Sequence, residues 1–112
     1  MKNNKGKTFK PRNEFRYNYS QNHKNFVFGE RGNKFQSVGI THEEYTFGKK
    51  NMPLSRNPQK GKTEPSFIRN GIISDKKKNY GRPLKNYSFS NKDYKNVKSK
   101  IRNYKKRHKK GK

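Results

Sequence analysis

Basic side chains are the residues of this sequence most able to do chemistry, and they concentrate toward its carboxyl end. Residues 75–112 carry 16 Lys and Arg against only two acidic residues. Lys and Arg that neutralise phosphates release condensed counterions, which gives a strong, salt-sensitive affinity for nucleic acid without sequence readout. A solvated charged tail is the alternative, but runs such as Lys76–Lys78 are typical of nucleic-acid-binding segments.

Aromatic residues alternate with these cations. A cation two residues before a tyrosine recurs every seven residues, at 78–80, 85–87 and 92–94. This combination suits single-stranded nucleic acid, because the cation contacts phosphate while the ring stacks on a base. Tyr80 and Tyr87 fall in irregular sequence, so we predict stacking for them, with packing inside the protein as the alternative. The predicted nucleic-acid-binding residues are Lys76, Lys77, Lys78, Tyr80, Arg82, Lys85, Tyr87, Lys95, Lys98, Arg102, Lys105, Lys106, Arg107, Lys109 and Lys110.

Candidate catalytic and metal-binding residues are scarce. Of the three histidines, only His42 stands beside carboxylates, those of Glu43 and Glu44. An acid–base or metal site needs several groups that converge on a rigid scaffold. We therefore interpret residues 42–44 as a solvated polar turn.

Two further sequence features exclude particular chemistries. Gly61, Lys62 and Thr63 match the end of a phosphate-binding loop, but Arg56 stands where that loop requires its first glycine. The chain contains no cysteine, which excludes disulfides and thiolate zinc sites. We expect a non-enzymatic protein with no catalytic residues, no cofactor and no metal site.

The clearest predicted element is a basic amphipathic helix over about 91–107. Ser90 can cap its first turn together with Asp93, in a pattern close to a capping box. Apolar residues then follow at helical spacing, at positions 94, 97, 101 and 104. The other faces of this helix carry Lys and Arg.

Residues 26–74, which include the least charged segment at 37–74, hold the best strand signals. Residues 26–28 are Phe-Val-Phe, and Asn70-Gly71 separates two apolar segments at 67–69 and 72–74. Asn-Gly favours a type I′ turn, because both central residues of that turn need positive φ. The sequence predicts either a small β-hairpin-containing core over about 26–74 or continued disorder there.

Composition as a whole predicts a largely disordered or irregular basic chain. The formal net charge is +24, and Leu, Ile, Val and Phe account for only 18 of 112 residues. A strongly charged chain with so little apolar surface is expected to stay unfolded. The predicted organisation is a flexible basic arm at 1–25, the small β-rich core at 26–74, and a highly basic tail with its helix at 75–112.

The leading functional hypothesis is a protein that binds nucleic acid mainly through phosphates. RNA, including ribosomal RNA, is favoured over DNA because no groove-reading module is visible. The alternative is an interaction protein that docks on an acidic protein through residues 37–74, including one within a DNA-transfer or packaging machine. No apolar stretch predicts an integral membrane segment or a secretory signal, so we expect a cytoplasmic protein. The sequence leaves the oligomeric state open.

Overall fold

Three consecutive antiparallel strands form the centre of the fold. The computed structural model describes residues 8–110, except for the side chains of residues 107–110. Its long strands are β1 (Lys10–Asn18), β2 (His23–Arg31) and β3 (Lys34–Thr41). Arg31 pairs with Lys34, and Gly32 between them has a φ of +61°, as a two-residue turn with glycine in its first central position requires.

Short strands complete the sheet along the other edge of β3. They are β6 (Met52–Pro53), β7 (Phe67–Ile68) and β8 (Ile73–Lys76), and a separate hairpin consists of β4 (Tyr45–Thr46) and β5 (Lys49–Lys50). Both β7 and β8 pair with β3, through Ile40–Ile68 and Ser37–Ile73. Strands β7 and β8 therefore run one after the other along the same edge of β3, and residues 69–72 bulge out between these two paired segments.

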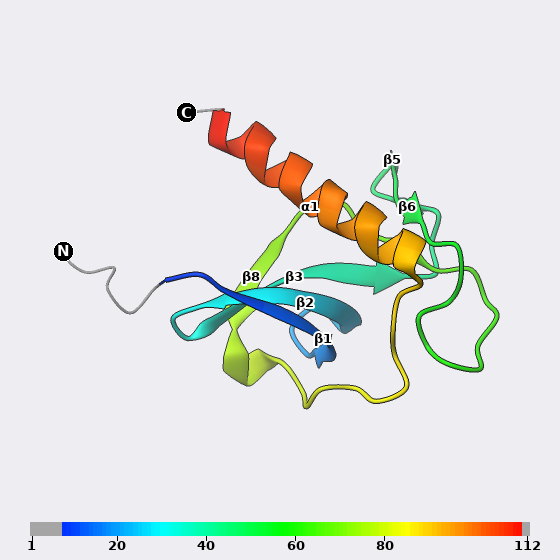
Figure 1. Cartoon of the computed structure of the whole chain (residues 1–112), viewed down its shortest axis with the longest axis horizontal. Helices are drawn as coiled ribbons and strands as arrows, with labels where there is room; N and C mark the ends of the chain where they lie inside the picture. The colour runs from blue at the N-terminus through cyan, green and yellow to red at the C-terminus, as the bar shows by residue number, and fades with distance from the viewer. Residues whose placement is uncertain (1–7, 111–112) are drawn as a thin grey trace.

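Helix α1 (Asn91–Lys110) crosses one face of the sheet, as Figure 1 shows. Ser90 begins it: the backbone N–H of Asp93 donates to Ser90 Oγ at 3.1 Å. Val97 and Ile101 are buried in the main core cluster with Phe15 and Phe26. The expected carboxyl-terminal helix is thus present and continues three residues beyond the predicted end.

A second, smaller cluster lies apart from the main core and consists of Val27, Phe35 and Tyr80. The guanidinium groups of Arg12 and Arg16 lie 5.4 and 4.7 Å from the centre of the Phe35 ring. Cations over an aromatic face are attracted by its quadrupole. Two of the excess basic side chains therefore contribute to the packing of this smaller cluster.

The expectation of a largely disordered or irregular chain is wrong, because residues 10–110 build a sheet and a packed helix. Apolar residues are few, but most of the large ones are at least partly buried. Among the described residues the exposed large hydrophobic side chains are Tyr19, Tyr45 and Phe47. Aromatic rings supply much of the core: Phe26 lies 5.3 Å from Phe15 and 4.9 Å from Phe89, centre to centre. Strand β1 also occupies much of the segment that we expected to be a flexible arm.

The predicted Asn70-Gly71 hairpin is also wrong, since β7 and β8 pair with β3 and not with each other. The tight hairpin turn forms instead at Phe47-Gly48 between β4 and β5, where φ is +51° and +78°. Two successive positive φ values mark a type I′ turn. A phenylalanine at such a position is rare, which explains why the sequence did not reveal it.

The side chain of Asp75 links the loop after β1 to the region after β8. Its carboxylate accepts hydrogen bonds from Asn18 (3.1 Å), Ser20 (2.6 Å) and Asn79 (2.8 Å). Partial burial acts to raise the pKa of Asp75, but these bonds outweigh it and lower the pKa to about 2.

Because the folded-state pKa of Asp75 is depressed, its stabilising effect is present above about pH 4 and is lost as the pH falls toward 2. We expect Asp75→Asn to lower the free energy of unfolding by about 1 kcal/mol at pH 6, since solvent screens a partly exposed group. Urea denaturation should show that the difference in free energy of unfolding between the parent and Asp75→Asn narrows between pH 4 and pH 2. Glu44→Gln, at an exposed acid, is the control, and an equal loss of stability in that variant would contradict the assignment.

Candidate functional site

A pocket lies where the three long strands meet at one end of the sheet. Strand pairing places Tyr17 opposite Lys24 and Asn18 opposite His23. In the antiparallel ladder of β2 and β3, Asn25 pairs with Gly39. Two residues further along this ladder, His23 therefore lies opposite Thr41. The two hairpins thus gather Tyr17, His23, Lys24 and His42 around one pocket, although they are distributed over 26 residues of sequence.

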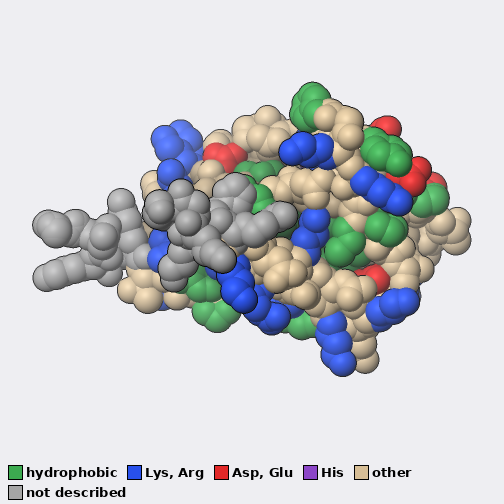
Figure 2. All heavy atoms as spheres, turned by 90° about the horizontal axis from the view of Figure 1, so that it is seen from above, with side chains coloured by type: hydrophobic (Ala, Val, Ile, Leu, Met, Phe, Trp, Pro, Cys, Tyr) green, Lys and Arg blue, Asp and Glu red, His purple; other side chains and the backbone are tan. Residues whose placement is uncertain are grey.

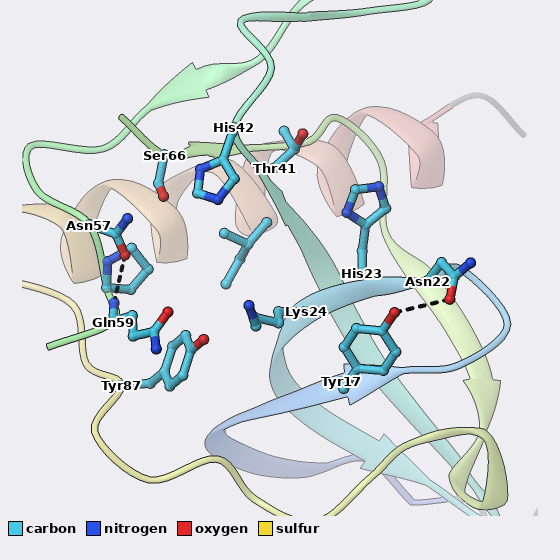
Figure 3. Close-up of a pocket in the computed structure, with 12 residues that line it drawn as sticks. Tyr17, Asn22, His23, Lys24, Thr41, His42, Asn57, Gln59, Ser66 and Tyr87 are labelled. Atoms are coloured by element: carbon cyan, nitrogen blue, oxygen red, sulfur yellow. Dashed lines mark hydrogen bonds between the residues drawn. The ribbon is translucent and has the colours of Figure 1, made fainter. Parts of the chain in front are cut away.

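Two loops form the other wall of this pocket. Lys60 N–H donates to the carbonyl of Asn86 at 2.7 Å, and Ser88 N–H donates to that of Pro58 at 2.9 Å. This pairing holds Tyr87 beside Gln59, as Figure 3 shows. The cavity measures about 150 Å³, which is less than pockets that enclose whole small molecules. It therefore suits one group of a larger ligand.

The ring of His42 has a defined orientation at this site. Its Nδ1 lies 3.0 Å from the carbonyl oxygen of Pro65. A carbonyl oxygen only accepts, so Nδ1 carries the hydrogen, and Nε2 of the neutral ring is left to accept a proton. His42 is exposed, so a ligand can reach this nitrogen.

His23 is half-buried at the start of β2. Burial lowers its pKa, and the positive charge of Arg69 and the nearby His42 lower it further, against a hydrogen bond to the backbone of Ile40 that raises it. The ring is therefore mainly neutral at neutral pH. Two imidazoles with different environments thus line the same pocket.

A cation and two phenol rings complete this arrangement. In Figure 3, Lys24 lies between Tyr17 and Tyr87. The Lys24 ammonium is 6.0 Å from the centre of the Tyr87 ring, and the Tyr17 hydroxyl donates to Asn22 Oδ1 at 3.0 Å. Lys24 is exposed and can contact an anionic group in the pocket.

Four of the seven acidic residues interact within the fold. Glu14 and Glu30 form ion pairs with Arg12, at 3.3 and 2.8 Å. Asp75 accepts the hydrogen bonds described above, and the buried Asp93 accepts those of the Ser55 backbone N–H, at 2.8 and 3.0 Å. Few carboxylates therefore remain to offset the surface cations, and Lys and Arg side chains are distributed over the face shown in Figure 2.

The predicted nucleic-acid-binding residues do not form one contact region. Lys76 pairs with Lys34 at the start of β3, whereas the pocket lies at the end of that strand. Seven residue steps at about 3.3 Å place Lys76 roughly 23 Å from the pocket. Lys77 and Lys78 follow it, and Arg82 is exposed in the next loop.

The remaining predicted residues divide between the pocket and the helix. Tyr87 lines the pocket, and Lys85 is exposed two residues before it. Lys95, Lys98, Arg102, Lys105 and Lys106 belong to α1. The side chains of Arg107, Lys109 and Lys110 lie outside the described residues. Of the predicted set, the segment 85–87 is thus the part that the structure brings to the pocket.

Tyr80 occupies the protein interior and cannot stack on a base. It is 6 % exposed, its ring lies 5.1 Å from that of Phe35, and its hydroxyl is 2.8 Å from Ser37 Oγ. Packing, the alternative considered for this residue, is what the structure shows.

We expect Tyr80→Phe to lower the free energy of unfolding by about 1 kcal/mol, because it leaves the buried Ser37 hydroxyl with one bond fewer. Affinity for RNA should stay unchanged. Urea denaturation and fluorescence anisotropy measure the two quantities. A fall in affinity without a fall in stability would instead indicate that the Tyr80 hydroxyl reaches RNA.

Three pocket residues, Tyr17, His23 and Lys24, are not among the residues predicted from the sequence, and His42 falls in the segment predicted to be a solvated turn. The available signal was the position of the turns at 19–22 and 32–33. Once these are fixed, strand register places the end of β1, the start of β2 and the end of β3 side by side.

Among the described side chains, those of residues 8–106, no three His, Cys, Asp or Glu lie close enough to form a metal site. No helix within residues 8–110 has the length and apolar character to span a membrane. Comparisons with protein-family models, curated proteins and solved structures gave no match.

Proposed function

We propose that this protein binds nucleic acid through phosphate contacts, with RNA preferred over DNA. The observation that carries the proposal is the uncompensated charge. The net charge is +24, and four of the seven acids are engaged inside the fold, Glu14 and Glu30 among them. A surface of this kind binds a polyanion through counterion release.

The centre of the binding surface is assigned to the histidine pocket, defined by Tyr17, His23, Lys24, His42 and Tyr87. Two further exposed cations, Lys60 and Lys62, lie in the loop that forms its wall. Cations beside accessible rings suit a single strand, whose phosphates and bases can be contacted together.

Fluorescence anisotropy with a labelled 12-nucleotide RNA tests the proposal. For about four phosphate contacts, log K should fall with log salt with a slope near −3, since each contact to a single strand contributes about −0.7. DNA of the same sequence should bind more weakly. An affinity that is independent of salt, or equal binding of polyglutamate, would contradict the proposal.

A second candidate is docking on an acidic protein through residues 37–74. Phe67 and Ile72 from this segment are partly buried, so only part of each side chain is accessible to a partner. The feature that favours docking is the β4–β5 hairpin, where Phe47 is 94 % and Tyr45 is 55 % exposed. An exposed aromatic pair at a hairpin tip is typical of a protein contact.

Phe47→Asn separates the two candidates. Asparagine tolerates the positive φ of this turn, so we expect the free energy of unfolding to rise by about 1 kcal/mol. RNA affinity should stay within twofold of the parent, while binding of any acidic protein partner is lost. A tenfold loss of RNA affinity would place Phe47 in the RNA surface instead.

A further inference from the structure

We propose that the histidine pocket cleaves RNA, with His23 and His42 exchanging the protons of a transesterification at phosphorus. The proposal rests on RNA binding as the function and adds a reaction at the centre of the same surface. The two rings come from different strand ends and line one cavity with Lys24 between flanking tyrosines. This convergence on a sheet is what the sequence did not predict for either histidine.

The reaction needs no reactant besides RNA. The ribose 2′-oxygen forms a bond to the adjacent phosphorus, and the bond from phosphorus to the 5′-oxygen of the next nucleotide breaks. One imidazole takes the proton of the 2′-hydroxyl, and the other, protonated, gives its proton to the leaving 5′-oxygen. The products are a 2′,3′-cyclic phosphate and a 5′-hydroxyl. DNA lacks the 2′-hydroxyl and cannot react.

The surroundings of the two rings assign their roles. His23 is mainly neutral at neutral pH, because burial and the charge of Arg69 disfavour its cation, so it serves as the base. His42 is then left for the acid role: Pro65 fixes its Nδ1–H, so Nε2 is the ring atom that can exchange a proton with RNA, and the residue is exposed.

Lys24 supplies the third component. Its ammonium is held near the Tyr87 ring and is exposed to the cavity. Charge accumulates on the non-bridging phosphate oxygens in the transition state, and a positioned cation stabilises it there. The small volume of the cavity fits a phosphodiester group of a strand whose remaining nucleotides lie on the basic surface outside.

Two histidines also occur as metal ligands. Among the side chains that the structure describes, no third His, Cys, Asp or Glu is placed to complete a metal site with them, so the pair fits proton transfer better than metal binding. This difference can be measured, because proton transfer by imidazoles continues in a chelator.

The test is cleavage of a 12-nucleotide RNA by the full chain in EDTA, compared among the parent and its His23→Gln, His42→Gln and His108→Gln variants. We expect products ending in 2′,3′-cyclic phosphate by mass spectrometry, and a loss of rate of at least about 100-fold for His23→Gln and His42→Gln. His108→Gln, the same change in α1, should cleave at the parent rate. Affinity for 2′-O-methyl RNA, which cannot react, is measured in all four proteins. Because His23 and His42 line the binding pocket, we expect their variants to lose affinity, but by far less than the loss of rate, whereas His108→Gln should bind like the parent.

Each of the other outcomes contradicts either the proposed reaction alone or both the reaction and the binding function. Binding of 2′-O-methyl RNA without any cleavage by the parent overturns the reaction and leaves the binding function standing, whereas absence of binding overturns both. Cleavage that survives both pocket substitutions comes from another source, and cleavage that stops in EDTA requires a metal, so either result overturns the proposal. Thermal unfolding monitors the fold, and the exposed His42 carries the test if His23→Gln unfolds.

Discussion

Replacing Lys60 and Lys62 together by glutamate should lower the affinity for single-stranded RNA by about 30-fold at 100 mM salt. Both side chains are exposed in the loop whose backbone, through Lys60 N–H and Asn86 O, forms the wall of the histidine pocket. Each replacement removes one phosphate contact and introduces repulsion. The slope of log K against log salt should therefore become shallower by about 1.4 for two lost contacts to a single strand.

A matched control is available at the other end of β3. Lys34 and Lys76 are exposed and pair across the sheet, so replacing both by glutamate changes the net charge by the same amount. We expect this control to weaken binding less than threefold. Equal losses in the two double variants would contradict a binding surface centred on the pocket and would favour diffuse attraction by the whole molecule.

Replacing Phe26 by alanine should lower the free energy of unfolding by about 3–5 kcal/mol, enough to unfold a domain of this size. Phe26 is fully buried and packs edge-on against Phe89, with their ring centres 4.9 Å apart, and it also contacts Phe15 and Tyr94. The cavity left by the ring cannot be filled by the few aliphatic side chains of this core.

Phe47→Ala provides the control for this prediction, because the same side chain is removed from a site that is 94 % exposed. Urea denaturation followed by circular dichroism should show a large shift for Phe26→Ala and no destabilisation for Phe47→Ala. Similar, small effects in both variants would be the behaviour of an irregular chain and would contradict the packed sheet.

The carboxyl-terminal helix could be predicted because its signals are local. Ser90 caps it through the Asp93 N–H, and the spacing of Val97 and Ile101 marks the buried face. For the rest of the chain, overall composition led to the wrong prediction of a largely disordered or irregular chain. An average over 112 residues does not register that the phenylalanines are concentrated where strands and helix meet, nor that Arg12 and Arg16 pack over the Phe35 ring.

The pocket could not be predicted because it depends on register between distant residues. His23 and His42 are 19 residues apart, and neither has a neighbouring motif. Their convergence depends on the turn before His23, where Asn22 has a φ of +60°, and on the turn at Gly32. A shift of one residue in either ladder would send every side chain of a strand to the other face. Tyr80 shows the converse, since a ring within a basic segment lies buried beside Phe35.

Titration of ¹⁵N-labelled protein with a 2′-O-methyl RNA oligonucleotide tests the central claim most directly, because amide signals report which residues the strand contacts. We predict that shifts concentrate at residues 17–24, 40–42, 57–62 and 85–87, around the histidine pocket. Shifts confined to residues 76–78 and to α1, with none at the pocket, would contradict the account.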